Sequence, residues 1–446
     1  MLKKILVANR GEIALRILRA CKELGIQTVV VHSTADEKEM FVRLADESVC
    51  IGPPQVKGSY LNIPSIISAA TIGNVDAIHP GIGMLSENAN FAKIVQDHGF
   101  TFIGPDFVHI ENMSNKIKAK DFALRIGLPI VPGSKTNIKD LAEAKIVASE
   151  IGYPILIKAT NGGGGRGIKK VYKEKELKEN LSLARKEAIQ SFGNDEVYIE
   201  KLIENPRHIE VQIIGDSFGN IIHVGERECS IQRRSQKIIE ECPSPAISEE
   251  ERGKICDLTI KAFKKVGYKS LGTVEYLYSS GEFYFIEMNT RLQVEHTITE
   301  EVYNLDIVKE QIFIASGEKI SIDQNDVKKI CHSIECRINA ENPITLLPST
   351  GMVTTYHPPG GPGIRVDSLL YSGCSVTAFY DGLVSKIIVK GNTRNECIMR
   401  LNRALDEYVI EGIETNISSL KKIINHKNFI SCDFDISWFD KQIENN

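Results

Sequence analysis

The sequence predicts a mixed α/β and α+β fold of several domains, and three observations lead to this fold class. A strand–helix–strand pattern opens the chain over residues 5–32. A strand that runs into a glycine-rich loop follows near residue 160. From His208 onward antiparallel strands dominate, and they include a hairpin that carries two carboxylates. With 446 residues, 42% of them hydrophobic, the chain can bury a large core divided among about two to four domains.

Residues 1–115 are predicted to form a Rossmann-like α/β domain. A buried strand at 5–8 precedes a helix at 11–24, which carries Ile13, Ile17, Cys21 and Leu24 on one face, and a strand at 28–32. Further alternation covers 49–51, 63–70, 77–79, 91–98 and 102–105. The glycines of residues 81–83 lack the third glycine of the dinucleotide fingerprint, so a dinucleotide site is not expected.

Residues 116–317 form the second predicted region, and its segment 131–203 is predicted to be a small mobile lid. The lid pattern has strands at 155–159, 168–172 and 197–201 and a charged helix at 174–191. Five of the six residues 162–167 are glycines, whose backbone amides can turn inward around phosphate oxygens. Lys158 adds a positive charge just before them, although no Walker A sequence follows. The alternative is a flexible surface loop.

The hairpin pairs strands 272–278 and 283–289 around a turn at 279–282. This register brings Glu275 across from Glu287 at roughly 5 Å, and Asn289 shares a face with Glu287. Facing carboxylates destabilise a sheet unless a cation lies between them, and oxygen ligands of this kind suit Mg²⁺. The alternative is a solvated sheet face with chance acids.

The run that follows the hairpin, residues 291–296, supplies groups for binding and deprotonating a small anion. The guanidinium of Arg291 suits an anion of bicarbonate's size, and Glu295 lies four residues on as a candidate base. On spacing alone, Arg337 in its strand-like segment is more typical of a surface ion pair. The final region, 318–446, is expected to contain short strands and a Pro/Gly-rich stretch at 358–363.

Composition excludes several classes of function. The net charge of -4 and pI near 6.3 indicate neither nucleic acid nor an anionic membrane as partner. Ten cysteines are scattered singly, which is typical of reduced thiols rather than disulfides or a zinc site. No apolar run approaches the roughly 18 residues of a transmembrane helix, and residues 9–12 interrupt any signal peptide. We therefore expect a cytoplasmic protein that is not associated with membranes.

The glycine-rich loop and the acidic hairpin together resemble the ATP-grasp superfamily, and more closely the biotin carboxylase family. The resemblance covers nearly the whole chain. Its motifs are residues 4–14, 76–81, 85–88, 205–208, 232–234, 285–296 and 335–341. The last two motifs are highly specific.

The resemblance implies that bicarbonate attacks the γ-phosphate of ATP to give carboxyphosphate, and that the carboxyl unit then passes to N1′ of biotin. It implies a nucleotide site made by Lys116, Lys158, Gly164, Gly165, Glu200, Lys201, Leu202, Ile203, His208, Gln232, Ser235, Glu275 and Glu287. Mg²⁺ or Mn²⁺ would be held by Glu275, Glu287 and Asn289, and bicarbonate by Lys237, Arg291, Gln293 and the Val294 backbone. The catalytic residues would be Arg291, Glu295 as the base, Lys237, and Arg337, which would stabilise the ureido oxygen of biotin.

Several positions depart from the family pattern. Ile82 and Met84 replace aromatic residues, Ser235 replaces a histidine and Thr297 replaces a proline. Ser114-Asn115 replaces a Gly-Asp pair, and Ser385 replaces a smaller residue. Position 82 is implied to line the biotin pocket. Because no charged catalytic group is lost, we expect affinity rather than reaction type to change.

No Met-Lys-Met carrier motif occurs in the sequence, so biotin is expected on a separate biotin carboxyl carrier protein, with separate carboxyltransferase subunits. The family implies a homodimer, and the first half-reaction of acetyl-CoA carboxylase in fatty acid biosynthesis. The alternatives are the same subunit of a pyruvate or other acyl-CoA carboxylase, and a catalytically weakened regulatory paralogue. A carbamoyl-phosphate-type synthetase is a further rival, because it also phosphorylates bicarbonate.

Overall fold

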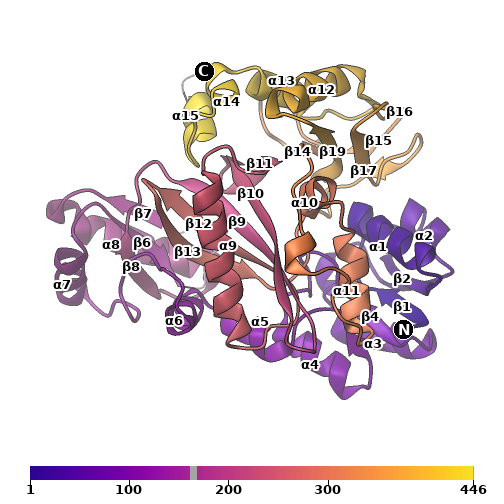
Figure 1. The fold of residues 1–446 in the computed structure, drawn as a ribbon, viewed down its shortest axis with the longest axis horizontal. Helices are drawn as coiled ribbons and strands as arrows, with labels where there is room; N and C mark the ends of the chain where they lie inside the picture. The colour runs from indigo at the N-terminus through magenta and orange to yellow at the C-terminus, as the bar shows by residue number, and fades with distance from the viewer. Residues whose placement is uncertain (161–167, 445–446) are drawn as a thin grey trace.

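The computed structural model describes residues 1–160 and 168–444. Figure 1 shows an N-terminal part around β1–β4, a lid around β6–β8 on one side, and a central sheet that continues into the C-terminal part. In the part of the chain that is described, no helix is long and apolar enough to cross a membrane.

The N-terminal part is built on a five-stranded parallel sheet with the order β3-β2-β1-β4-β5. The predicted strand–helix–strand opening is confirmed, and the order 2-1-4 around β1 is that of a doubly wound sheet. The elements are β1 (Lys4–Val7), α1 (Gly11–Glu23), β2 (Gln27–Ser33), α2 (Met40–Leu44), β3 (Glu47–Gly52), α3 (Ile63–Ile72), β4 (Ala77–His79), α4 (Ala89–Asp97), β5 (Thr101–Phe102) and α5 (Phe107–Met113), with a 3₁₀ turn at Val56–Gly58.

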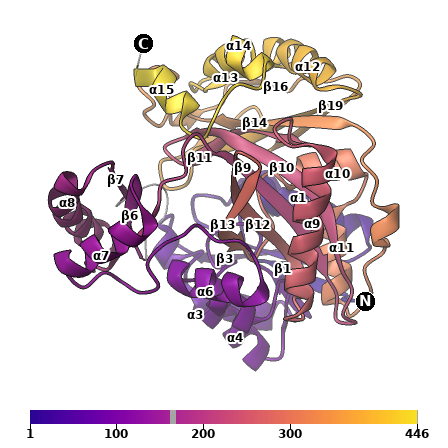
Figure 2. The ribbon, with the colours of Figure 1, turned by 60° about the vertical axis from the view of Figure 1, so that its left-hand side comes forward.

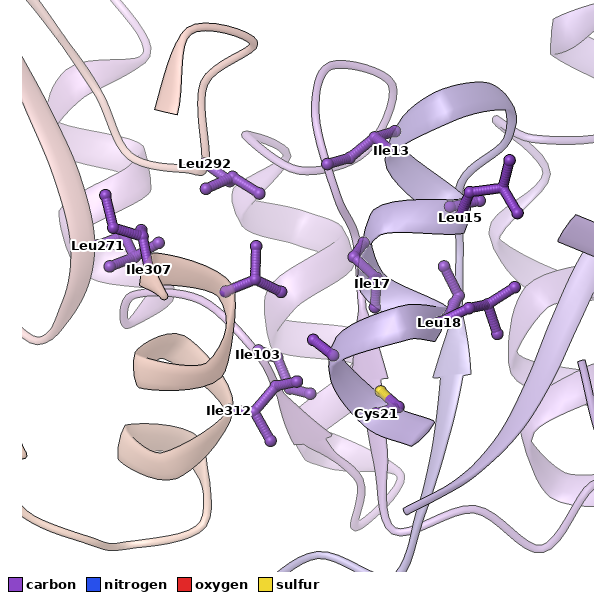
Figure 3. Packing of buried hydrophobic residues seen from close by; sticks show 14 of the residues in the cluster. Ile13, Leu15, Ile17, Leu18, Cys21, Ile103, Leu271, Leu292, Ile307 and Ile312 are labelled. Carbon is purple, nitrogen blue, oxygen red and sulfur yellow. The ribbon is translucent and has the colours of Figure 1, made fainter. Parts of the chain in front are cut away.

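A hydrophobic cluster joins this part to the segment that follows the hairpin. Ile17 of α1, Leu292 and Ile307 of α11 (Ile307–Ala315) share the cluster shown in Figure 3. Leu292 is only 1% exposed. Because the core holds Leu292, the chain segment that carries its neighbours Arg291 and Gln293 is fixed in place.

The lid has a three-stranded antiparallel sheet with the order β7-β6-β8 and its own hydrophobic core. Its elements are α7 (Leu141–Ile151), β6 (Ile155–Ala159), β7 (Ile168–Val171), α8 (Glu174–Phe192) and β8 (Val197–Lys201). The predicted strands and the long helix are confirmed, whereas the sequence did not indicate α7. Figures 1 and 2 show the lid projecting from the molecule, with α6 (Lys116–Ile126) where the lid joins it. The glycine-rich loop, 161–167, lies outside the described residues.

The centre of the molecule is an eight-stranded antiparallel sheet with the order β13-β12-β9-β10-β11-β14-β19-β17. Strands β14, β17 and β19 follow residue 317, so this one sheet crosses the expected boundary at 317/318. The strands are β9 (Arg207–Gly215), β10 (Ile221–Arg233), β11 (Gln236–Cys242), β12 (Ser270–Ser279), β13 (Glu282–Asn289), β14 (His332–Asn339), β17 (Ile364–Ser368) and β19 (Leu383–Gly391).

The acidic hairpin has the predicted register. Glu275 of β12 lies directly opposite Glu287 of β13, next to an irregularity between Glu275 and Tyr276. The two loop residues, Ser280 and Gly281, have φ values of 53° and 85°. Positive φ at both positions is typical of the type I′ turn, which matches the twist of paired strands and so fixes this register.

Helices α9, α10 and α12 pack against the central sheet. The expectation of short strands for 318–446 is incomplete, because this region also contains helices. α9 begins with a capping box made by Ser248 and Glu251, a pattern that is visible in the sequence as Ser-x-x-Glu. The helices are α9 (Glu249–Lys264), α10 (His296–Tyr303), α12 (Arg394–Glu407), α13 (Ile417–Ile424), α14 (Lys427–Ile430) and α15 (Trp438–Glu444), with a 3₁₀ turn at Gln324–Asp326. The short strands β15 (Gly351–Met352), β16 (Thr355–His357), β18 (Ser375–Val376) and β20 (Val409–Glu411) form two small sheets.

Candidate active site

Glu275 is the most heavily bonded carboxylate of the hairpin. His208 Nε2 lies 2.9 Å from its Oε2, and Lys237 Nζ lies 3.0 Å from its Oε1. Asn289 Nδ2 and Gln293 Nε2 also donate to Oε1, at 2.7 and 2.9 Å. Burial alone would raise the pKa of Glu275, but these cations lower it, so the group is ionised. Side chains of the protein thus supply part of the positive charge expected beside the paired acids.

The facing carboxylate, Glu287, has a different environment. Burial and the charge of Glu275 raise the pKa of Glu287, with Lys116 acting in the opposite direction. A carboxylate destabilised in this way gains from a divalent cation, so Glu275 and Glu287 together fit Mg²⁺. Asn289 fits less directly, because its Oδ1 accepts a 2.8 Å hydrogen bond from Arg291 Nη2. The same oxygen has a second lone pair, which is available to a metal ion.

Lys237 connects the acids of the site. Its Nζ lies 2.5 Å from Glu210 Oε2 and 2.6 Å from Glu295 Oε1, in addition to its contact with Glu275. These carboxylates raise the pKa of Lys237 well above its ordinary value despite its burial. Glu210, Glu275 and Glu295 therefore all contact the same buried ammonium group.

Glu295 is held between two cations. Its Oε1 contacts Lys237, and its Oε2 accepts a hydrogen bond from Arg337 Nη2 at 3.0 Å. Burial opposes ionisation, but Lys237 and Arg337 lower the pKa of Glu295 well below its usual range. Arg337 also donates from Nε to Glu240 Oε1 at 2.5 Å. Arg337 is thus a partly buried member of the site rather than a surface ion pair.

Arg291 is oriented from the N-terminal part of the molecule. Its Nε donates to Glu87 Oε2 at 2.8 Å, and Glu87 Oε1 accepts from the backbone N–H of Thr290 at 3.1 Å. A third bond runs from Arg291 Nη1 to the Leu292 carbonyl at 3.3 Å. The loop that carries Glu87 therefore sets the position of the guanidinium.

The predicted nucleotide residues lie on both sides of the lid junction. Lys158 of β6 pairs with Glu200 of β8. Burial would raise the pKa of Glu200, but Lys158 and Lys120 lower it to about 2. On the central sheet, Gln232 Nε2 lies 2.7 Å from His208 Nδ1. Gln232 therefore contacts one of the side chains that bind Glu275.

Other predicted residues contribute in different ways. Lys201 Nζ donates to the carbonyls of residues 152 and 153, so its ammonium is used within the lid. Leu202 and Ile203 follow β8, and the Leu202 N–H donates to the Pro154 carbonyl. Lys116 begins α6, and burial is the main cause that lowers its pKa. Gly164 and Gly165 lie outside the described residues.

The positions that depart from the family pattern are also placed. Ser235 is exposed in the turn between β10 and β11, with φ of 65°. Ile82 is half-buried against the cluster of Figure 3, and its carbonyl accepts a 2.9 Å bond from Asn9 Nδ2. Val294, a predicted bicarbonate ligand rather than a departure, accepts a hydrogen bond at its backbone carbonyl from Lys386 Nζ at 2.7 Å. Thr297 donates its hydroxyl proton to Glu335, a bond that proline could not make.

The sequence did not single out one group at the centre of the site. Arg227 is fully buried and bonds to five side chains, those of Glu210, Gln212, Thr273, Gln293 and Thr299. Alternation along β9 could have indicated Glu210, because it shares a face with His208. Glu87, Lys120 and Glu240 were also missed, since their partners are distant in sequence.

Three family models match the chain. The biotin carboxylase N-terminal domain matches residues 1–110, and the biotin carboxylase C-terminal domain matches 335–441. Between them, the ATP binding domain of the carbamoyl-phosphate synthase L chain matches 115–323. The chain belongs to the biotin carboxylase family. The flanking matches exclude the carbamoyl-phosphate rival, and the predicted ATP-grasp fold is confirmed.

Individual members of the biotin carboxylase family match over almost their full length. The biotin carboxylase of Pseudomonas aeruginosa is 53% identical over 444 residues, 99% of each chain. A Campylobacter jejuni biotin carboxylase complexed with β,γ-ATP has a TM-score of 0.96, 47% identity and 99% coverage of both chains. The biotin carboxylase domain of Hydrogenobacter thermophilus 2-oxoglutarate carboxylase, with MgADP, ADP and bicarbonate, has a TM-score of 0.94 and 46% identity. That alignment covers 99% of this chain and 98% of the other. This biotin carboxylase is therefore an ATP-dependent ligase.

Proposed function

We propose that this biotin carboxylase carboxylates biotin on a separate carrier protein, using bicarbonate and ATP and releasing ADP and phosphate. The observation that supports this most directly is the position of Glu295, with one oxygen on Lys237 and the other on Arg337. The proposed base would therefore lie between a candidate bicarbonate ligand, Lys237, and a candidate biotin ligand, Arg337.

The same arrangement suggests how bicarbonate would be activated. In this structure Glu295 is too well paired to be a strong base, because Lys237 and Arg337 stabilise its charge. Bicarbonate bound to Arg291, Gln293 and the Val294 backbone would draw Lys237 away from Glu295. The pKa of Glu295 would then rise, and it could accept the bicarbonate proton.

Phosphoryl transfer would follow on the hairpin side of the site. A bicarbonate oxygen attacks the γ-phosphorus of ATP, the bond to the ADP oxygen breaks, and carboxyphosphate forms. Glu275 and Glu287 would hold Mg²⁺, which neutralises phosphate charge during transfer. Lys116, Lys158 and His208 lie around this position and would contact the nucleotide.

Transfer to biotin would occur at Arg337. The carboxyl unit would leave phosphate and form a bond to N1′ of biotin, and the departing phosphate would accept the proton of N1′. The guanidinium of Arg337 would stabilise the negative charge that develops on the ureido oxygen. Ile82 would line the biotin pocket from the N-terminal part, without the ring of the family's aromatic residue.

The expected partners are a biotin carboxyl carrier protein and carboxyltransferase subunits, and we propose a cytoplasmic homodimer. Acetyl-CoA is the proposed final acceptor, as in fatty acid biosynthesis. The similarity to a domain of a 2-oxoglutarate carboxylase supports an oxo-acid acceptor, such as pyruvate, as the second candidate. The acceptor would be chosen by the carboxyltransferase rather than by this chain.

An ATPase assay with and without bicarbonate and free biotin tests the proposal. We expect ATP cleavage to require bicarbonate and to increase when biotin is added. Nucleotide binding without bicarbonate-dependent cleavage would instead identify a catalytically weakened paralogue. Adding candidate carrier proteins, with covalent biotin carboxylation as the readout, then tests the partner.

A further inference from the structure

Lys120 is a charged residue of the nucleotide side to which the family motifs assign no role. It lies on α6, one helical turn after Lys116, and its side chain is only 12% exposed. Its Nζ contacts Glu200 Oε2 and lies 4.9 Å from the centroid of the Tyr198 ring. The other oxygen of Glu200 contacts Lys158. One buried carboxylate therefore holds two ammonium groups.

These two ammonium groups come from different parts of the molecule. Lys158 and Glu200 both belong to the lid sheet, on the neighbouring strands β6 and β8. Lys120 lies on α6, which packs against hairpin strand β13 of the central sheet. Figures 1 and 2 show α6 where the lid meets the rest of the molecule. The contacts of Lys120 with Glu200 and Tyr198 thus cross this junction.

The charges around Glu200 are unbalanced in favour of the cations. Burial lowers the pKa of Lys120, and the nearby Lys158 and Lys116 lower it further, while Glu200 opposes them. A buried ion pair of Lys158 and Glu200 would already be neutral without Lys120. A second buried lysine on the same carboxylate is costly if the group is only structural, but it suits a site that receives a polyphosphate.

We propose that Lys120 is a further residue of the nucleotide site, which holds Glu200 so that Lys158 is free to turn to the phosphates. Without Lys120, Lys158 would be the one ion-pair partner left to Glu200 among residues 1–160 and 168–444, and a phosphate would have to break that pair to bind Lys158. A buried carboxylate left unpaired is strongly unfavourable, so nucleotide affinity would fall. The inference rests on the proposed nucleotide site and adds a residue to it.

Lys120→Met tests this role, with Lys118→Met as the matched control. Lys118 is an exposed lysine on the same helix, so both variants lose one positive charge. We expect Lys120→Met to raise the KM for ATP and the Kd for ADP roughly tenfold or more, about 1.4 kcal/mol. The KM values for bicarbonate and free biotin should stay within about twofold, and Lys120→Arg should restore most of the affinity.

Two results would overturn the proposal. The first is an ATP KM and ADP Kd for Lys120→Met within about twofold of the wild type, and the second is an equal loss in Lys118→Met. Should Lys120→Met not fold, Lys120→Gln replaces it. In the Glu200→Gln background, removal of Lys120 should have little further effect on ADP affinity, because the two act as a pair. Failure of the proposed function would show differently, as a wild-type protein without bicarbonate-dependent ATP cleavage.

Discussion

Replacement of Arg227 by lysine should disable bicarbonate chemistry while leaving the protein folded. Arg227 bonds to Glu210 at 2.5 Å and to Gln293 Oε1 at 2.8 Å. Glu210 in turn holds Lys237, and Gln293 holds Glu275. One guanidinium therefore fixes both sides of the proposed bicarbonate pocket without touching bicarbonate itself.

The size of the effect follows from the number of bonds. Arginine donates to five side chains here, whereas an ammonium has only three donors, so at least two acceptors lose their bond to residue 227. Hydrogen bonds from a charged donor contribute about 1.5–3 kcal/mol each, which gives roughly 3–6 kcal/mol for two. The lost bonds position Gln293 directly and Lys237 through Glu210. We therefore expect kcat/KM for bicarbonate to fall at least about 100-fold.

Bicarbonate-dependent ATP cleavage and thermal unfolding should be measured on Arg227→Lys and on Arg252→Lys. Arg252 of α9 is another buried arginine, paired at 2.8 Å with Glu226 of β10 and with Glu249 of its own helix, and it shares no hydrogen-bond partner with Arg227 among the described residues. Its replacement should lower Tm without changing the bicarbonate KM. The reasoning is refuted if Arg227→Lys keeps its bicarbonate kcat/KM within about threefold of the wild type.

Three further predictions concern the metal, the biotin pocket and a buried acid. Glu287→Gln should fold normally but lose Mg²⁺-ATP turnover, and near-wild-type turnover at limiting Mg²⁺ would remove the hairpin from its assigned role. Ile82→Tyr should lower the KM for free biotin by roughly tenfold, the equivalent of about 1.4 kcal/mol, with little change for ATP, and an unchanged biotin KM would place Ile82 outside the pocket. Burial raises the pKa of Glu335 to about 8 from its ordinary 4.5. The folded state therefore holds this proton more tightly, and the wild type loses stability as pH rises between these values. The Tm of Glu335→Gln relative to wild type should accordingly increase from about pH 5 to about pH 9, and a constant difference would contradict this.

The hairpin shows what the sequence could predict. Its turn residues, Ser280 and Gly281, favour one loop geometry, and alternation along each strand then places Glu275 opposite Glu287. Local rules are sufficient when both partners belong to one hairpin. Arg291 and Glu295 could also be predicted locally, because both lie within the specific motif at residues 285–296.

Residues that join distant strands could not be predicted in this way. Arg227 and Lys386 are buried charged residues of central strands, and nothing in the neighbouring sequence identifies their partners. The contact of Lys120 with Glu200 depends on how the lid lies against α6, which periodicity does not encode. Arg227 is separated from its five partners by 15 to 72 positions along the chain, Lys120 from Glu200 by 80 and Lys386 from Val294 by 92, so these contacts appear only in the folded structure.

The continuous central sheet limits how this enzyme could be divided. β11, which carries Lys237, is hydrogen-bonded directly to β14, which carries Arg337. A fragment cut at residue 317 would expose β11 as a bare edge strand, with unpaired amides and carbonyls that invite aggregation. A protein divided for engineering should therefore keep β9–β19 together. The lid is the better unit to exchange between relatives, because it has its own sheet and its own hydrophobic core.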